Sequence, residues 1–229
     1  MATSGTTSFD LDIDDIIQEA YERCGARTNS GYDLQSARRS LNILFSEWGN
    51  RGVHLWKVEL NEQLLTAGTQ TYTAPSNAND ILEAYVSTTT GTTSDTNDVS
   101  LTKISRSEYA ALPNKGSQGQ PSQYYVDRQT TPTITLYQVP DASTYTYLKY
   151  YYIKRIEDSG AYTNTADVVF RFIPCMVAGL AYYISMKINP QMTQQNKMIY
   201  EDELSRALNE DGQRTSVYIT PQTYYPQGV

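Results

Sequence analysis

The sequence is poor in the side chains that most enzymes use for catalysis. Its 229 residues include one histidine, His54, and two cysteines. Any chemistry would therefore depend on carboxylates, lysine, tyrosine or hydroxyl groups. The acidic pairs Glu157–Asp158 and Glu201–Asp202 are sequence neighbours, and neighbouring side chains on a strand or helix point in different directions, so neither pair forms an acid–base couple. We expect a protein that is not an enzyme and has no cofactor, metal or catalytic residue.

Charged residues are also scarce, at 19 %, and the 25 acidic side chains outnumber the 18 basic ones, so the net charge is −7. No basic tract interrupts the sequence. Proteins that bind nucleic acid tightly neutralise phosphates with lysine and arginine. We therefore do not expect this protein to bind DNA tightly.

No hydrophobic run is long enough to cross a membrane. The most apolar stretch, Phe172–Met186, has about 15 residues and contains Pro174, whereas a span needs roughly 20. The N-terminal residues do not have the pattern of a secretory signal. Cys24 and Cys175 are isolated on predicted apolar helix faces, which favours reduced core residues of an intracellular protein. We expect no contact with membranes.

Two helices are predicted near the N-terminus. Apolar residues at spacings of three and four predict a helix over 12–24, with Asp12 as N-cap and Gly25 at its end. A second stripe predicts a helix over 33–51 that stops at Gly52. The opposite face of this second helix carries Arg38, Arg39, Asn42 and Glu47. We interpret that face as solvated, and contact with a neighbouring subunit is the alternative.

From residue 57 to 155 the hydrophobic period changes to two, and Thr, Tyr, Val and Ile predominate. A short hairpin connection at Ala67–Gly68 is predicted between the first two strands. Ser105 is expected to cap a short helix over 106–112, and the polar segment 87–97 is expected to be an exposed loop. The predicted strands are 57–66, 70–73, 81–87, 99–104, 123–127, 133–137 and 144–153.

Helical periodicity returns near the C-terminus, where helices are predicted over 171–187 and 191–209. Pro174 fits the first turn of the former helix, and Gly179 would allow another helix to approach closely. The latter places Tyr200, Leu204, Ala207 and Leu208 on one side. The remaining segment, 212–229, has no helical period but contains apolar and aromatic groups that are costly to leave in water, so we expect it to lie on a partner.

These elements predict an α+β protein. Its N- and C-terminal helices form a four-helix bundle, into which an antiparallel β-sandwich or barrel is inserted, and an extended C-terminal tail follows. The expected domains are a discontinuous helical domain of residues 1–56 and 156–211, an inserted β domain of residues 57–155, and the tail 212–229.

Aromatic side chains occupy both faces of the predicted strand 144–153. Tyr145, Tyr147 and Tyr151 share one face, whereas Leu148, Tyr150 and Tyr152 share the other. One interpretation is a sandwich strand buried on a single side, and the alternative is that one face contacts another subunit, where tyrosine is enriched. Trp56 similarly fits either packing at the hinge between helices and strands, which we favour, or a surface anchor.

Four short blocks in this order resemble the head-to-tail adaptor, or connector, proteins of tailed bacteriophages, especially short-tailed ones. They span most of the chain, although none is a chemical motif. The blocks are Ala37–Asn42 leading into Glu47–Trp48 and Arg51–Gly52, then Gly119–Pro121, Tyr151–Asp158 and Phe170–Tyr183.

The resemblance implies a structural virion protein at the head–tail junction, assembled in the host cytoplasm. Its copies would form a homo-oligomeric ring, twelvefold in that family, which joins the portal protein to the tail nozzle or another tail component and encloses the DNA ejection channel. The helices and the C-terminal tail would face the portal, and the β domain would face ring neighbours and the next tail component. Candidate portal-binding residues are Tyr218, Ile219, Pro221, Tyr224, Tyr225 and Pro226, and candidate intersubunit residues are Arg38, Arg39, Tyr145, Tyr147 and Tyr151.

A second function class stays open from the sequence. Regions rich in Thr and Tyr with few charges also suit carbohydrate contact, so the alternative is a phage tail or host-recognition module that binds glycans. The four predicted helices and the presence of only two tryptophans argue against this alternative.

Overall fold

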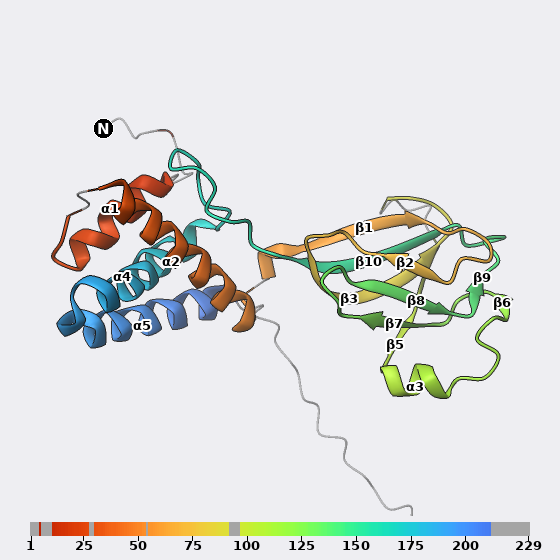
Figure 1. The fold of residues 1–229 in the computed structure, drawn as a ribbon. Coiled ribbons are helices and arrows are strands. Elements are labelled where there is room, and N and C mark those ends of the chain that lie inside the picture. Colours follow the sequence, from red (N-terminus) through yellow and green to blue (C-terminus); the bar gives the residue numbers. More distant parts are fainter. Residues whose placement is uncertain (1–4, 6–10, 28–29, 54, 92–96, 212–229) are drawn as a thin grey trace, which may run out of the picture.

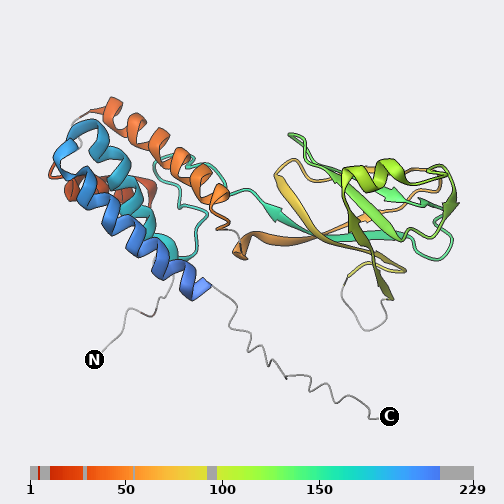
Figure 2. The same cartoon turned by 90° about the horizontal axis from the view of Figure 1, so that it is seen from below.

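A computed structural model describes residue 5 and residues 11–27, 30–53, 55–91 and 97–211. The chain is a mixed α+β protein, as predicted, with helices at one end and β-sheets at the other (Figure 1). Two stretches of chain connect these parts, one running from α2 into β1 and one leaving β10 (Figures 1 and 2). Each part has its own cluster of buried apolar side chains.

The helical part contains α1 (Ile13–Arg23), α2 (Gly31–Asn50), α4 (Ile173–Ile188) and α5 (Thr193–Asp211). The central helix is α4, which packs against each of the other three. Its sequence is apolar on most faces, and nine of its side chains, from Cys175 to Ser185, are buried. Short 3-10 turns, Phe170–Phe172 and Pro190–Met192, precede α4 and α5.

Helix ends follow the predicted signals with two differences. Asp12 is the N-cap of α1, but its side chain makes no capping hydrogen bond. Instead, the amides of Ile13 and Asp14 donate to the carbonyls of Asn164 and Tyr162, at 3.0 and 3.1 Å. The start of α2 lies two residues earlier than predicted, because the Ser30 hydroxyl accepts from the amide of Asp33 at 3.3 Å and caps the first turn.

The helical core contains the residues that periodicity assigned to it, with one exception. Trp48, Cys24, Cys175 and Tyr200 are all buried, and both cysteines are free thiols. Leu208 was predicted to share the buried side of the last helix, but it is 36 % exposed. The neighbouring Ala207 is buried in the core, and because a helix turns by about 100° per residue, Leu208 points in another direction.

The β part holds two four-stranded sheets and a two-stranded ribbon. The side chains of both larger sheets meet in one core, which includes Tyr72, Ile81, Tyr124, Ile134 and Tyr150. The first sheet has the strand order β1 (Val58–Leu64), β10 (Tyr147–Lys154), β3 (Ala78–Ser87) and β4 (Asp98–Ser100). The second sheet has the strand order β2 (Thr71–Thr73), β8 (Thr133–Tyr137), β7 (Gln123–Asp127) and β5 (Thr102–Ile104). The ribbon pairs β6 (Gln118–Gly119) with β9 (Val139–Pro140).

Strand pairing corrects three predictions. Ala67–Gly68 is a turn with Gly68 at φ 81°, but it does not close a hairpin, because β1 pairs with β10 and β2 pairs with β8 in the other sheet. The single strand predicted over 99–104 is two strands, which change sheets at the buried Leu101. The sheets are also not wholly antiparallel, since β5–β7 and β6–β9 are parallel pairs.

The short helix after β5 is confirmed as α3 (Arg106–Ala111). Ser105 accepts from the amide of Glu108, while the Glu108 carboxylate accepts from the amide of Ser105, so both donors of this capping box are satisfied.

Candidate functional site

The junction between the helices and the sheets is a packed hinge. The 3-10 turn η1 (Leu55–Lys57) leads into β1 there. The ring of Trp56 packs against that of Phe172, with centroids 4.6 Å apart, at the edge of the helical core. Lys57 is 4 % exposed and forms an ion pair with Asp167. Trp56 therefore takes the favoured packing position at the hinge.

The segment 156–169, which follows β10, runs back along α2. The amide of Ser159 donates to Asn42 Oδ1 at 2.9 Å. Arg38 donates to the carbonyl of Gly160, and its guanidinium lies 4.9 Å from the ring centroid of Tyr162. These contacts correct the interpretation of this α2 face as simply solvated, because Arg38 and Asn42 both bind another segment of the same chain.

Glu47, on the same predicted face, belongs to a network between helices. Its carboxylate accepts from the Tyr183 hydroxyl at 2.9 Å and pairs with Arg51 at 2.6 Å. Arg51 also pairs with Glu201 on α5, at 2.7 Å. Burial, followed by the hydrogen bond to Glu47, raises the pKa of Tyr183 to about 12. The network holds α2, α4 and α5 together.

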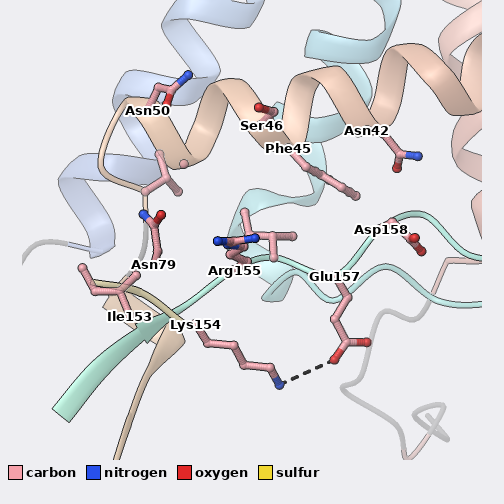
Figure 3. A pocket seen from close by; sticks show the side chains of 13 residues that line it. Asn42, Phe45, Ser46, Asn50, Asn79, Ile153, Lys154, Arg155, Glu157 and Asp158 are labelled. Atoms are coloured by element: carbon pink, nitrogen blue, oxygen red, sulfur yellow. Dashed lines mark ion pairs between the residues drawn. The ribbon is translucent and has the colours of Figure 1, made fainter. Parts of the chain in front are cut away.

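A cavity of about 460 Å³ lies where α2 faces the chain leaving β10 (Figure 3). Asn42, Phe45 and Ser46 project toward it from α2, whereas Lys154 and Glu157 flank it from below and form an ion pair at 3.5 Å (Figure 3). Its lining mixes amide and apolar groups with four charged side chains, those of Lys154, Arg155, Glu157 and Asp158. The cavity separates the two parts of the molecule on one side of the hinge.

Arg39 differs from its neighbours on α2. It is exposed and forms no ion pair with any residue that the structure describes. Together with Tyr32, Gln35, Arg38 and Asn42 it lines an open hollow of about 460 Å³. Partial burial, followed by the positive charge of Arg39, lowers the pKa of Lys187. The surface around Arg39 is therefore electropositive and concave, which suits a carboxylate.

The tyrosines of β10 separate onto two faces, as alternation predicted. Leu148, Tyr150 and Tyr152 are buried in the β core, whereas Tyr147 and Tyr151 are half-buried on the other face. The position of Tyr145 corrects the prediction, because this residue precedes the strand and packs against the β core. It therefore does not share the outer face with Tyr147 and Tyr151.

The outer face of this sheet holds a buried lysine that the sequence reasoning did not single out. Lys149 is 2 % exposed and donates to the carbonyl of Gly91 at 2.5 Å. It also pairs with Asp98 at 3.2 Å, and Glu62 lies 4.0 Å away. Because Glu62 in turn accepts from the amide of Gly91 at 2.7 Å, these groups hold the end of the polar loop onto the sheet. The alternation of β10 places Lys149 on the outward face. Its burial depends on the contacts that it makes with Gly91 and Asp98 in the folded chain.

The six candidate portal-binding residues, Tyr218, Ile219, Pro221, Tyr224, Tyr225 and Pro226, lie outside the described residues. Within the described ranges, none of the helices has the length and apolarity that a membrane span requires.

Comparison with known proteins places this two-part architecture in a family. The SU10 adaptor protein family matches residues 4–224, nearly the full chain. Comparison with curated proteins returned no match. The family is one of bacteriophage structural adaptors, which are components of the virion and interact with other head and tail components. Because the match covers both the helices and the sheets, the chain belongs to the SU10 adaptor protein family.

Proposed function

We propose that the chain is the head-to-tail adaptor of a phage virion, whose copies form a ring that joins the portal to the tail and encloses the DNA channel. Family membership over residues 4–224 carries this proposal. The two-part shape supports it, because one end of the molecule can contact the head while the other contacts the tail (Figure 1). Assembly takes place in the host cytoplasm, and the ring has twelve subunits.

We assign a separate role to each of the two parts that has its own hydrophobic core. Residues 1–56 and 156–211 act as one discontinuous helical domain, a four-helix bundle that faces the portal. Residues 57–155 act as an inserted β-sandwich that faces ring neighbours and the tail nozzle or another tail component. The separate core clusters and the packed hinge at Trp56 and Phe172 support this division.

In this proposal the tail 212–229 binds the portal through its aromatic and proline residues. The last helix, α5, ends on the side of the helical part nearest the sheets (Figures 1 and 2). An extended chain spans at most about 3.3–3.6 Å per residue, so the tail has a reach on the order of 60 Å. That reach is sufficient for it to pass the helical part and lie on a partner.

Ring contacts are assigned to two surfaces, with Tyr147 and Tyr151 on the outer face of β10 and Arg39 on α2. All three side chains are at least partly exposed. Arg38 contributes by supporting the hollow beside Arg39, since its own guanidinium binds Gly160 and Tyr162. Tyr145 contributes through the β core that supports β10.

The net charge of −7 suits a channel through which DNA must pass. Carboxylates repel phosphates, so a ring of negative subunits would not retain the DNA. Passage without specific binding is the consequence.

Electron microscopy of the purified chain mixed with its cognate portal protein tests the proposal. We expect class averages of portal particles that carry an additional ring. A portal that acquires no additional density would contradict the proposed function.

A truncation tests whether the C-terminal tail binds the portal. Removal of residues 216–229 should abolish portal docking and leave the unfolding transition unchanged, because the helical core lies within residues 13–207. The matched control is deletion of residues 92–96 in the polar loop, which should dock normally. Docking by the truncated chain would exclude the tail as the portal-binding segment.

A further inference from the structure

The outward face of α1 carries an acidic stripe. Asp15, Gln18 and Glu22 recur on this face at spacings of three and four, and Leu11 precedes the helix by two residues. All four are exposed. The buried residues of α1, including Ile13, lie on the opposite side. Asp15 and Glu22 form no ion pair with any described residue. Within the part of the chain that the structure describes, these two carboxylates therefore have no cationic partner.

The outward face of α2 carries a matching stripe. Tyr32, Gln35, Arg39 and Ile43 follow the same spacing and are exposed. Tyr32 and Ile43 have 69 % and 55 % of their surface exposed, which is large for apolar and aromatic side chains. Arg39 lies between them at the open hollow. Tyrosine and arginine are both enriched at protein–protein interfaces.

The two stripes are complementary when the helices run antiparallel. Along the helix axis Tyr32 to Ile43 covers about 16 Å and Asp15 to Glu22 covers about 10 Å, since a helix rises 1.5 Å per residue. In that alignment Leu11 lies against Ile43 and Asp15 lies against Arg39. Gln18 then lies against Gln35, and Glu22 against Tyr32, so each position meets a group of matching chemistry.

Because α1 and α2 both pack on α4, the two stripes of one chain cannot contact each other, and the contact must form between copies. Helix α4 packs against both α1 and α2, whereas α1 and α2 contact each other far less. The two stripes point away from α4 on separate helices, and Asp15 does not reach Arg39 within the chain. A surface that binds a different surface on the next copy makes a heterologous interface, and repeated heterologous interfaces generate rings.

We propose that the acidic stripe of α1 in one copy docks antiparallel on the Tyr32–Arg39–Ile43 stripe of α2 in the next copy, as one component of the ring contact. This inference rests on the proposed function, since it names the partner surface for Arg39. Its occupant is a second copy of this chain. The carboxylate of Asp15 enters the hollow beside Arg39, and Leu11 covers Ile43.

Cross-linking tests the contact directly in the full-length chain assembled on its cognate portal. Cys24 and Cys175 are buried, at 0 % and 1 % exposure, so the wild-type chain should not react with a short bis-maleimide. A chain carrying both Asp15→Cys and Arg39→Cys should give a ladder of covalent oligomers beyond the dimer. Either single variant should give no ladder, because the two thiols must come from different surfaces.

Charge reversal provides a second measurement. Arg39→Glu should lower the yield of rings about tenfold or more, because it replaces attraction to Asp15 with repulsion. Adding Asp15→Arg to that variant should restore most of the yield. Lys197→Glu is the matched control, since it makes the same charge change at an exposed position on α5 outside the contact.

The outcomes separate the two proposals. A ladder together with rescue by the double reversal supports the contact. Rings that assemble normally with Arg39→Glu, or that give no ladder from the double-cysteine chain, would overturn the contact while leaving the adaptor function in place. A wild-type chain that forms no ring on its portal would overturn both.

Discussion

The indole Nε1 of Trp48 donates a hydrogen bond to the hydroxyl of Tyr200 at 3.0 Å, and neither side chain has exposed surface. The same hydroxyl donates to Glu47 Oε2 at 3.4 Å. This link joins α2 to α5, two helices separated in sequence by the entire β part. It is therefore a contact on which the discontinuous helical part depends.

Tyr200→Phe should lower the free energy of unfolding by about 1–3 kcal/mol, because it leaves the buried Trp48 donor without a partner. Urea unfolding followed by tryptophan fluorescence measures this change. Tyr32→Phe is the control, since Tyr32 is 69 % exposed, and it should have little effect. Equal stability of the two variants would mean that the Trp48 hydrogen bond contributes nothing to folding.

Gly179→Ala should destabilise the chain by about 1–3 kcal/mol through overpacking. A Cβ at this position would lie 2.8 Å from Leu44 Cδ1 and 2.9 Å from Tyr200 Cε2. Both neighbours are fully buried, so they cannot move aside cheaply. This confirms the expectation that Gly179 permits close approach of another helix. Thermal unfolding monitored by circular dichroism measures the loss.

Gly49→Ala is the matched control for Gly179→Ala. Gly49 is also helical, on α2, but a Cβ there would meet nothing within 4 Å. The alanine should therefore stabilise the chain by up to about 1 kcal/mol, through helix propensity alone. If both alanines stabilise, the packing around Gly179 is looser than the structure indicates.

Lys149→Met should destabilise the β part by about 2 kcal/mol, because Asp98 and Glu62 lose a buried partner. Hydrogen exchange at the amide of Gly91 should accelerate, since Glu62 would no longer be held in place to accept from it. Lys103→Met, which removes a 36 % exposed lysine paired with Asp80, should cost less than about 1 kcal/mol. An unchanged exchange rate at the amide of Gly91 would show that Lys149 does not hold the loop on the sheet.

The free energy of unfolding should fall as the pH rises from about 10 to about 12. Burial raises the pKa of Tyr124 and of Tyr150 to about 12, from the ordinary tyrosine value of 10.0. In that window the unfolded chain loses protons that the folded chain keeps, so alkali favours unfolding. Each tyrosine should contribute a slope on the order of 1.4 kcal/mol per pH unit.

Urea unfolding at a series of alkaline pH values measures this slope. Tyr150→Phe should make the slope shallower, because one of the titrating groups is removed. A slope that does not change in the variant would show that Tyr150 ionises equally in the folded and unfolded chain.

Periodicity was sufficient to locate the helices. The stripes that include Ile16, Leu41 and Leu180 predicted α1, α2 and α4 to within about two residues, because a helix satisfies its own backbone hydrogen bonds and leaves a local pattern. The alternation of β10 likewise predicted which of its tyrosines share a face. Strand pairing was harder to predict from the sequence, since the pairing partners of β1 and β2 are distant segments of the chain.

The candidate contact residues show the same division. The sequence placed Arg38 and Arg39 side by side on one helix, but only the fold distinguishes them: Arg38 binds Gly160 and Tyr162, whereas Arg39 stays exposed at an open hollow. The helical turn separates adjacent residues by about 100°, and the returning segment 156–169 reaches only one of the two.

By itself, the sequence determined the α+β class, the helical and β regions, the scarcity of catalytic groups and the resemblance to phage adaptors, because these depend on composition and local spacing. Only the tertiary structure decided that the strand pattern over 99–104 changes sheets at Leu101, that Tyr145 packs inward, and that Lys149 is buried under a polar loop. Each of these depends on contacts between segments far apart in the chain, and long-range packing leaves no local periodicity in the sequence.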